Sequence, residues 1–171
     1  MIEILTNRLM IIPCSLDIAK SLVFHRKELD KRSPIEFPYS WPSSFVKGFL
    51  PFYIECLENK QPEKECGLWL IILYEEKKII GDILLLGKPS KEGDVELCYH
   101  VEDKDVDESL AFEAVDAFID WLTYQKFVKR IVMECDVRQD QSIRLFEKLG
   151  MICTKKDGRF LKWEIQKKDL E

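Results

Sequence analysis

Residues 94–137 decide the fold, and their central part, residues 108–125, reads ESLAFEAVDAFIDWLTYQ. Six apolar residues of this segment recur at spacings of three and four, which is typical of an amphipathic helix. Strand-like apolar runs flank the helix, at Asp94–Val101 before it and at Arg130–Val137 after it. A strand, a helix and a strand in this order predict a helix that packs on a sheet. The helical stripe consists of Leu110, Ala114, Ala117, Phe118, Trp121 and Leu122.

The rest of the chain predicts further strands and helices around this unit. A first strand ends at Pro13, and a helix capped by Ser15 or Asp17 follows it. A second helix begins near Ser44, and Pro51 should kink or break it. After the central unit, Asp140 is suited to cap another helix, which Gly150 should end. The remaining strands are expected at residues 68–74, 78–86, 151–154 and 160–165, with the first two and the last two forming hairpins.

The predicted fold class is α/β (α+β), with a mixed, mostly antiparallel central sheet of six to seven strands and about four helices. The chain of 171 residues predicts a single domain, residues 1–171. Its net charge of −5 argues against a nucleic-acid partner, and its apolar runs are too short for a membrane span. Six scattered cysteines and two histidines predict no metal site, and we expect a cytoplasmic protein.

Four strings resemble the GNAT superfamily of acyl-CoA-dependent N-acyltransferases, and in particular its ribosomal-protein N-terminal (RimJ/RimL-like) branch. The start LTNRLMIIP, at residues 5–13, resembles L-x-T-x-R-L-x-L-R-P, and VELCYHV, at 95–101, resembles x-E-L-G-Y-W-V. AFEAV, at 111–115, resembles A-T-E-A-V, and SIRLFEKLGM, at 142–151, resembles S-x-R-x-x-E-K-L-G-F. The matches span nearly the whole chain in the order of the family.

The resemblance implies a site for acetyl-CoA where the strands Val95–Val101 and Arg130–Val137 splay apart. Backbone groups near Tyr99, His100 and Val101 would pair with the pantetheine arm. The loop before the central helix would hold the pyrophosphate with its N–H groups, aided by the positive end of the helix. The implied reaction is direct attack of a neutral amine on the thioester, and no metal takes part.

The pyrophosphate loop departs from the family pattern Arg/Gln-x-x-Gly-x-Gly/Ala. Glycines are used there because the backbone must approach phosphate oxygens closely. Five acidic residues between positions 102 and 108 would repel a phosphate, although Asp107 or Glu108 could instead cap the helix. The six loop positions here are Val106, Asp107, Glu108, Ser109, Leu110 and Ala111, of which only Ala111 fits.

Ser142 matches the serine that this branch places near the sulfur of CoA, where it could protonate the leaving thiolate. The alternative is a serine that bonds the backbone of its own helix. Gln139 stands three residues earlier, where the family has asparagine, and keeps the amide for cofactor contact. Phe146 lacks a hydroxyl and is expected in the core.

Two residues of the splayed strand are candidates for proton transfer. Glu96 could act as the base for the amine, or it could be a structural partner of Arg8 or Arg130. His100 replaces an aromatic residue and could serve as a base or a phosphate donor, or simply pack. We discount an acyl-cysteine at Cys98, because nothing nearby in the sequence activates the thiol.

The loop from Ser33 to Ser44 could shape the acceptor site with Phe37, Tyr39 and Trp41, beside Glu36. Alternatively, these aromatic residues could cover the sheet or form the contact of a homodimer. The preferred function is transfer of an acetyl group from acetyl-CoA to a primary amine, either a protein N-terminus or a small molecule. The alternative is a GNAT-fold pseudoenzyme that has lost acetyl-CoA affinity and acts as a binding or regulatory module.

Overall fold

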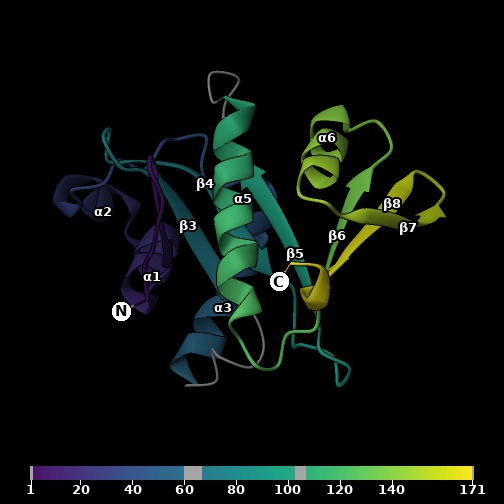
Figure 1. Cartoon of the computed structure of the whole chain (residues 1–171). Helices are drawn as coiled ribbons and strands as arrows, with labels where there is room; N and C mark the ends of the chain where they lie inside the picture. Colours follow the sequence, from purple (N-terminus) through teal and green to yellow (C-terminus); the bar gives the residue numbers. More distant parts are fainter. Residues whose placement is uncertain (1, 60–66, 103–106, 171) are drawn as a thin grey trace.

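The computed structural model describes residues 2–59, 67–102 and 107–170 (Figure 1). Eight strands form one open sheet in the order β1-β2-β3-β4-β5-β6-β8-β7, and β5 and β6 are its parallel pair. The strands are β1 (Ile4–Leu5), β2 (Leu9–Pro13), β3 (Gly67–Leu73), β4 (Lys78–Leu85), β5 (Asp94–Val101), β6 (Arg130–Asp136), β7 (Ile152–Asp157) and β8 (Phe160–Gln166). The predicted mixed, mostly antiparallel sheet is confirmed, but it has eight strands where six to seven were expected, because the two-residue β1 pairs with β2.

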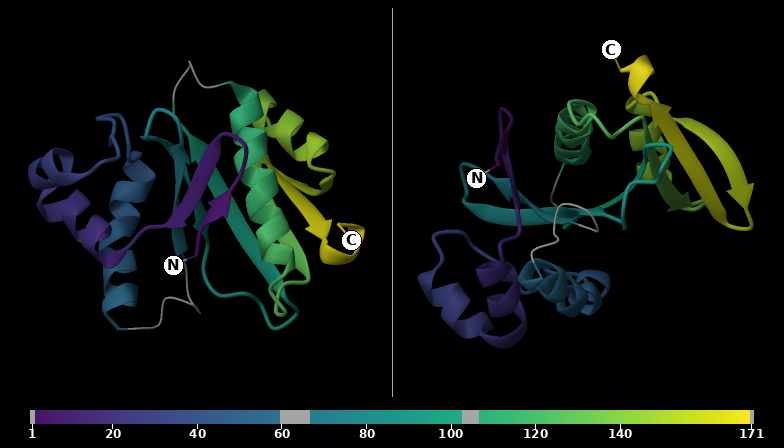
Figure 2. Two further views of the ribbon diagram at one scale, coloured as in Figure 1. Left: turned by 60° about the vertical axis from the view of Figure 1, so that its left-hand side comes forward. Right: turned by 90° about the horizontal axis from the view of Figure 1, so that it is seen from below.

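Helices cover both faces of the sheet. Figure 2 shows α5 on one face and the three N-terminal helices on the other. Each face has its own core, with Phe118 of α5 buried in one and Trp41 buried in the other. Among the described residues, the helices are α1 (Leu16–Phe24), α2 (Arg26–Arg32), α3 (Ser44–Glu58), α5 (Glu108–Thr123), α6 (Asp140–Lys148) and the short 3-10 helix η1 (Lys167–Asp169).

Three local expectations need correction. The first predicted helix divides at His25, whose backbone is not helical, so α1 and α2 are separate. Of the kink or break expected at Pro51, the break does not occur, because α3 continues through Pro51. Asp140 is not the cap of α6: Gln139 occupies that position, because its N–H already bonds the carbonyl of Asp136 and the chain turns one residue earlier. Ser15 caps α1 as predicted, by accepting from the N–H of Ile18 at 3.2 Å.

The ends of the other elements agree with the sequence pattern. Gly150 follows α6 with φ of +83°, the left-handed conformation that ends a helix without the cost of a Cβ. Both predicted hairpins form, as β3 with β4 and β7 with β8. In the described part of the chain, the longest helices fall short of the length and hydrophobicity needed to cross a bilayer.

Candidate active site

The parallel strands β5 and β6 are paired only over their first halves. Their register runs from Asp94 opposite Arg130 to Leu97 opposite Met133, and within the described residues it continues no further. At the paired end, the guanidinium of Arg130 bonds both carboxylate oxygens of Asp94, at 2.6 and 2.8 Å. The hydrogen bonds from Arg130 lower the pKa of Asp94. The strands are therefore clamped at one end and open at the other, as the family resemblance predicts.

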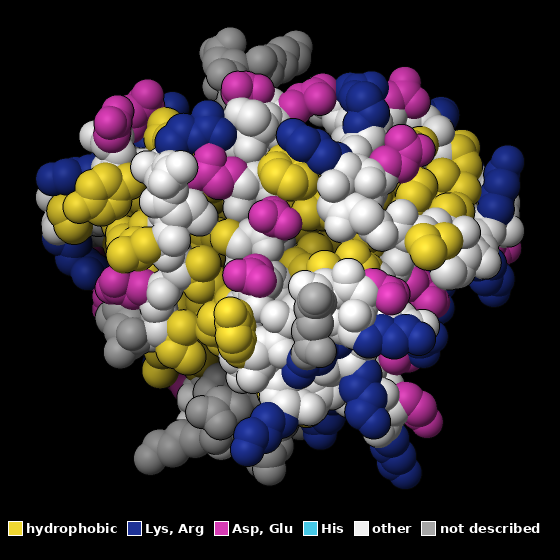
Figure 3. Space-filling model, viewed as in Figure 1, with side chains coloured by type: hydrophobic (Ala, Val, Ile, Leu, Met, Phe, Trp, Pro, Cys, Tyr) yellow, Lys and Arg dark blue, Asp and Glu magenta, His cyan; other side chains and the backbone are white. Residues whose placement is uncertain are grey.

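A cavity of about 820 Å³ lies at the open end, between β5 and the first turns of α5 and α6. Because β5 also pairs with β4 as far as Val101, only its β6 edge is free to bind a ligand there. Figure 3 shows this face, with acidic side chains along the exposed side of α5. The lining residues are Tyr99, His100, Val101, Asp107, Glu108, Ser109, Ala111, Phe112, Gln139, Gln141, Ser142, Arg144, Leu145 and Lys148.

Tyr99 and Ser142 join the two sides of the cavity. The phenol oxygen of Tyr99 lies 3.0 Å from the hydroxyl of Ser142, which stands in the first turn of α6. Ser142 thus bonds a side chain on the opposite strand, in place of the bond to its own helix that the alternative expected. Burial raises the pKa of Tyr99, so its hydroxyl remains protonated at neutral pH and can donate. The pair can deliver a proton into the cavity.

The N-terminus of α5 is capped by its own residues. Asp107 accepts from the backbone N–H of Ser109 at 3.0 Å and from its hydroxyl at 2.8 Å. The backbone bond from Ser109 is the main cause of the lowered pKa of Asp107. Arg8 reaches the same turn, with its guanidinium 3.0 Å from the Ser109 hydroxyl. The expectation that Asp107 could cap the helix is confirmed, and Glu108 pairs elsewhere.

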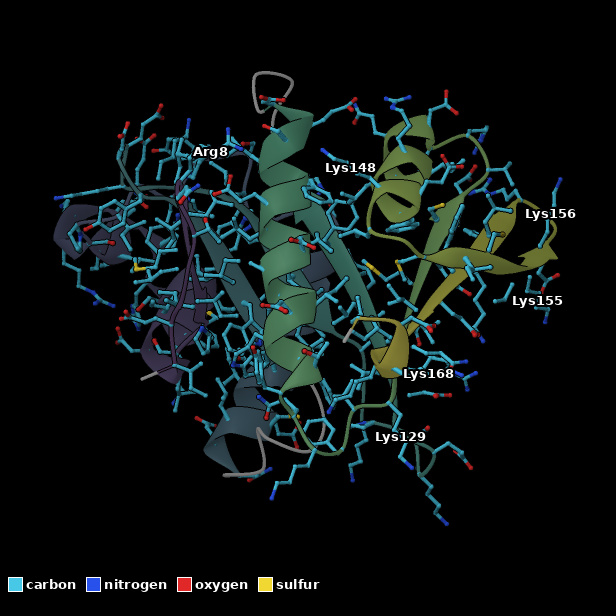
Figure 4. The ribbon with its side chains drawn as sticks, in the orientation of Figure 1. Arg8, Lys129, Lys148, Lys155, Lys156 and Lys168 are labelled. Atoms are coloured by element: carbon cyan, nitrogen blue, oxygen red, sulfur yellow. The ribbon has the colours of Figure 1, made fainter. Side chains whose placement is uncertain are left out.

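Two cations on α6 line the cavity, and the sequence analysis did not select them. Arg144 pairs with Glu108 at 2.8 Å, which links α6 to the N-terminus of α5. The ammonium of Lys148 lies 4.2 Å from the ring centre of Phe112, between the two helices (Figure 4). The signal was available, because Arg144 and Lys148 are four residues apart and so share one helix face. They supply positive charge beside the N-terminus of α5, where Asp107 and Glu108 are acidic.

The remaining predicted cofactor residues are placed as follows. Gln139 lines the cavity, and its side-chain oxygen accepts from the N–H of Asp136 at 2.7 Å. His100 lies 3.2 Å from Glu102 at the exposed end of β5. Leu110, in the first turn of α5, is buried in the core that this helix covers. Val106 lies outside the described residues.

Glu96 faces away from this cavity. It lines a second cavity of about 420 Å³ on the other face of the sheet, one residue before the pairing of β5 and β6 ends. The expected pairing of Glu96 with Arg8 or Arg130 is wrong. Arg8 pairs with Glu113 at 2.7 Å, and Arg130 pairs with Asp94. Among the described residues, the carboxylate of Glu96 has no ion pair.

Two residues near the open end are not placed to react. Burial raises the pKa of the Cys98 thiol to about 12, so the thiol remains protonated and a poor nucleophile. Phe146 is 1 % exposed and packs edge-on against Tyr99. The core position expected for Phe146 is confirmed, and the packing holds the Tyr99 ring in place.

Two of the aromatic residues in the loop that was expected to shape the acceptor site are part of the hydrophobic core. Phe37 and Trp41 are buried in the core on the α1–α3 face, while Tyr39 is 92 % exposed. The indole N–H of Trp41 donates to the carboxylate of Asp82 on β4 at 2.8 Å, and both groups are buried. The loop is thus anchored to the strand beside β5.

An open mixed sheet whose parallel strands splay beside a helix N-terminus is the architecture of the acyl-CoA-dependent N-acetyltransferases. The model of the acetyltransferase (GNAT) domain matches residues 8–152, and the chain belongs to this family. It is 24 % identical over 163 residues to the uncharacterized N-acetyltransferase YjdG of Bacillus subtilis (strain 168), covering 95 % of this chain and 97 % of that one.

Solved structures share the fold at low sequence identity. Ribosomal-protein-S5-alanine acetyltransferase from Vibrio fischeri aligns with a TM-score of 0.67 and 16 % identity, over 100 % of both chains. RimL, a ribosomal L7/L12 alpha-N-protein acetyltransferase solved with coenzyme A, aligns with a TM-score of 0.66 and 13 % identity, over 96 % of this chain and 98 % of that one. The RimL-like resemblance of the sequence is confirmed at the level of the fold.

Proposed function

We propose that the protein transfers an acetyl group from acetyl-CoA to a primary amine by direct attack. One observation carries the proposal: the pairing of β5 and β6 ends at Leu97, and the gap opens into a cavity lined by Tyr99 and Ser142. The free edge of β5 offers backbone donors and acceptors along the cavity wall. This is the support that an extended pantetheine arm needs.

The residues present fit the anionic end of acetyl-CoA through α6. Arg144 and Lys148 both line the cavity, and each is able to bond a phosphate oxygen. The backbone N–H groups of the first turn of α5 lie at the same end, although Asp107 already satisfies that of Ser109. Phosphate binding therefore requires Arg144 to exchange Glu108 for the ligand.

The thioester of the bound donor would supply an activated acyl group. In this proposal, Ser142 donates a proton to the leaving sulfur, and Tyr99 restores it through their 3.0 Å contact. Tyr99 regains its proton, through water, from the acceptor nitrogen, which loses its second proton as the C–S bond breaks and the amide forms. Glu96 accepts the ammonium proton of the acceptor, directly or through water, from the other face of the sheet. The second cavity, which Glu96 lines, is then the acceptor site. The two substrates would meet where the strands part.

The alternative remains a pseudoenzyme, and two contacts favour it. Asp107 caps α5 and Glu108 pairs with Arg144, so groups that could bind an anion already have protein partners. Both contacts are exposed, however, and the Glu108–Arg144 ion pair is therefore weak enough for a phosphate to displace. The transferase is the better-supported function.

Isothermal titration with acetyl-CoA, at low and moderate salt, tests the proposal first. We expect saturable binding that weakens as salt rises, because Arg144 and Lys148 supply the charge. A thiol assay for released CoA across a panel of primary amines then tests the transfer. Absence of binding at millimolar acetyl-CoA would overturn the transferase and favour the pseudoenzyme. Binding without CoA release on any amine would leave a cofactor-binding module.

A further inference from the structure

The cavity on the Glu96 face has opposite charges at its two sides. Its floor is formed by β5 and β6, which contribute the carboxylates of Glu96 and Glu134. Its outer wall is the β7–β8 hairpin, which contributes the ammonium groups of Lys155 and Lys162. Glu96 thus lies beside the point where the strands part, and Lys155 and Lys162 lie away from it. Lys88, which follows β4, also lines the cavity.

The strand register fixes this arrangement. Glu134 of β6 stands opposite Lys162 of β8, and Lys162 in turn stands opposite Lys155 of β7. Glu96 stands opposite Val132 of β6, two residues before Glu134. Its Cα is therefore two strand spacings across the sheet and two residues along it from that of Lys162, or roughly 12 Å away, whereas Glu134 is one strand spacing from Lys162. The sheet fixes these Cα separations.

The charged groups are available to a ligand. In the described part of the chain, Glu96, Glu134 and Lys155 form no ion pair, and Lys162 contacts Glu164 only at 3.4 Å. Asp157 also lines the cavity, two residues beyond Lys155 at the far end of the hairpin. A purely cationic amine would be attracted by the floor but repelled by Lys155 and Lys162.

We infer that the acceptor carries an anionic group roughly 12 Å from the amine that is acetylated. This inference rests on the proposed function, and it narrows the substrate class of the same site. The amine approaches Glu96, and the anion binds between Lys155 and Lys162. A polypeptide N-terminus with an acidic third residue fits, because the third Cα of an extended peptide lies about 7 Å from the amino group.

Binding of peptides, measured without acetyl-CoA, tests the inference independently of catalysis. The probes are two C-terminally amidated tripeptides with free N-termini, which differ only in glutamate or glutamine at the third position. We expect the glutamate peptide to bind roughly five- to tenfold more tightly at low salt, and the preference to shrink as salt screens the lysines. Competition by 6-aminohexanoate but not by hexylamine would extend the same charge pairing to a small acceptor.

Variants of the hairpin identify the groups responsible. The double variant Lys155→Gln and Lys162→Gln should reduce the preference to less than about twofold. The matched control is Lys156→Gln, because Lys156 is the next residue of β7, does not line the cavity and points to the other side of the hairpin (Figure 4). The control should keep the full preference.

The outcomes separate this inference from the proposed function. Equal binding of the two peptides, absence of binding by both, or a preference that survives the double variant would each overturn the inference. A preference for the glutamate peptide that the double variant removes supports it, even where no CoA is released. In that case the acceptor chemistry stands and the transferase proposal fails. If CoA were released only with amines that carry no anionic group, the transferase proposal would stand and the inference about the acceptor would fail.

Discussion

The hydroxyl groups of Tyr99 and Ser142 lie 3.0 Å apart and connect β5 to α6 at the place where β5 separates from β6. The contact is half-buried, and it brings together two residues that are 43 positions apart in the chain. Phe146 packs on the Tyr99 ring from the same helix as Ser142. The cavity is therefore lined by a pair of hydroxyl groups, and Tyr99 is held by packing on one side and by strand pairing on the other.

Replacing Ser142 by alanine should lower kcat about a hundredfold while leaving the KM for acetyl-CoA within about twofold. Ser142→Ala removes the group that delivers the proton but leaves the backbone edge of β5 in place. Tyr99→Phe should lower kcat less, and the double variant should be no worse than Ser142→Ala, because the two residues act in one chain. Steady-state kinetics with CoA release measures this. If the loss of kcat in the double variant were the product of the losses in the two single variants, the two residues would act independently.

Glu108→Gln should tighten acetyl-CoA binding by about two- to fivefold, because it releases Arg144 from its 2.8 Å ion pair. Arg144→Gln and Lys148→Gln should each weaken binding and reduce its salt dependence. Glu147→Gln is the matched control, since Glu147, on α6, is likewise an exposed carboxylate but does not line the cavity. Titration calorimetry at two salt concentrations gives the comparison. If Glu147→Gln tightened binding equally, the effect would come from the net charge of the protein and not from the release of Arg144.

Asp82 should make the protein less stable as the pH rises through about 6. Burial raises the pKa of Asp82 to about 6, while the bond from Trp41 and the charge of His100 lower it, and Glu102 raises it. Because the pKa is higher in the folded state, the stabilising contribution is complete below the unfolded value near pH 4 and is lost as pH rises through 6. The difference is about 3 kcal/mol.

Asp82→Asn removes this titration and keeps an acceptor for the indole of Trp41. We expect the free energy of unfolding of the native protein, relative to that of Asp82→Asn, to fall between pH 4 and pH 6.5 and to level off above that. Urea denaturation at a series of pH values measures both proteins under the same conditions. If the difference in the free energy of unfolding between the two proteins stayed constant over this range, the pKa of Asp82 would lie outside it.

Gly81→Ala should destabilise the sheet beside the cofactor edge by about 2 kcal/mol or more. A Cβ at Gly81 would collide with the carbonyl oxygen of His100 and lie 2.9 Å from the Cα of Val101, and both are backbone atoms of β5. Gly48→Ala, in α3, is the control, because nothing lies within 4 Å of the Cβ it would add. Thermal unfolding of both variants should show a loss only for Gly81→Ala.

Local pattern was enough for most of the secondary structure. The stripe from Leu110 to Leu122 identified α5, and the apolar runs identified β3, β4, β5 and β6 almost to the residue. The boundary at His25 was missed because the residues on both sides of it favour a helix. The cap of α6 was assigned to Asp140 because an acid at a helix start is a common cap, whereas the bonds that Gln139 makes with Asp136 decided the matter.

The candidate site was predicted in outline and corrected in its charges. Tyr99, Ser142 and Gln139 meet at one cavity as the motifs implied, and Asp107 caps α5 as one alternative held. Arg144 and Lys148 were missed, because the family pattern directs attention to the loop before α5. Glu96 was associated with Arg8 or Arg130 because opposite charges attract, but the competing partners Glu113 and Asp94 are nearer.

The sequence by itself determined the order of the longer elements and seven of the eight strands of the sheet, because hydrophobic periodicity and turn residues act over a few neighbouring positions. Only the tertiary structure decided which polar side chains meet. Tyr99 with Ser142 and Glu108 with Arg144 are contacts between distant segments, and Glu134 stands opposite Lys162 in the strand register. They depend on where β5 leaves β6 and how β8 inserts beside β6, and side-chain electrostatics at such distances has no signature in the linear chain.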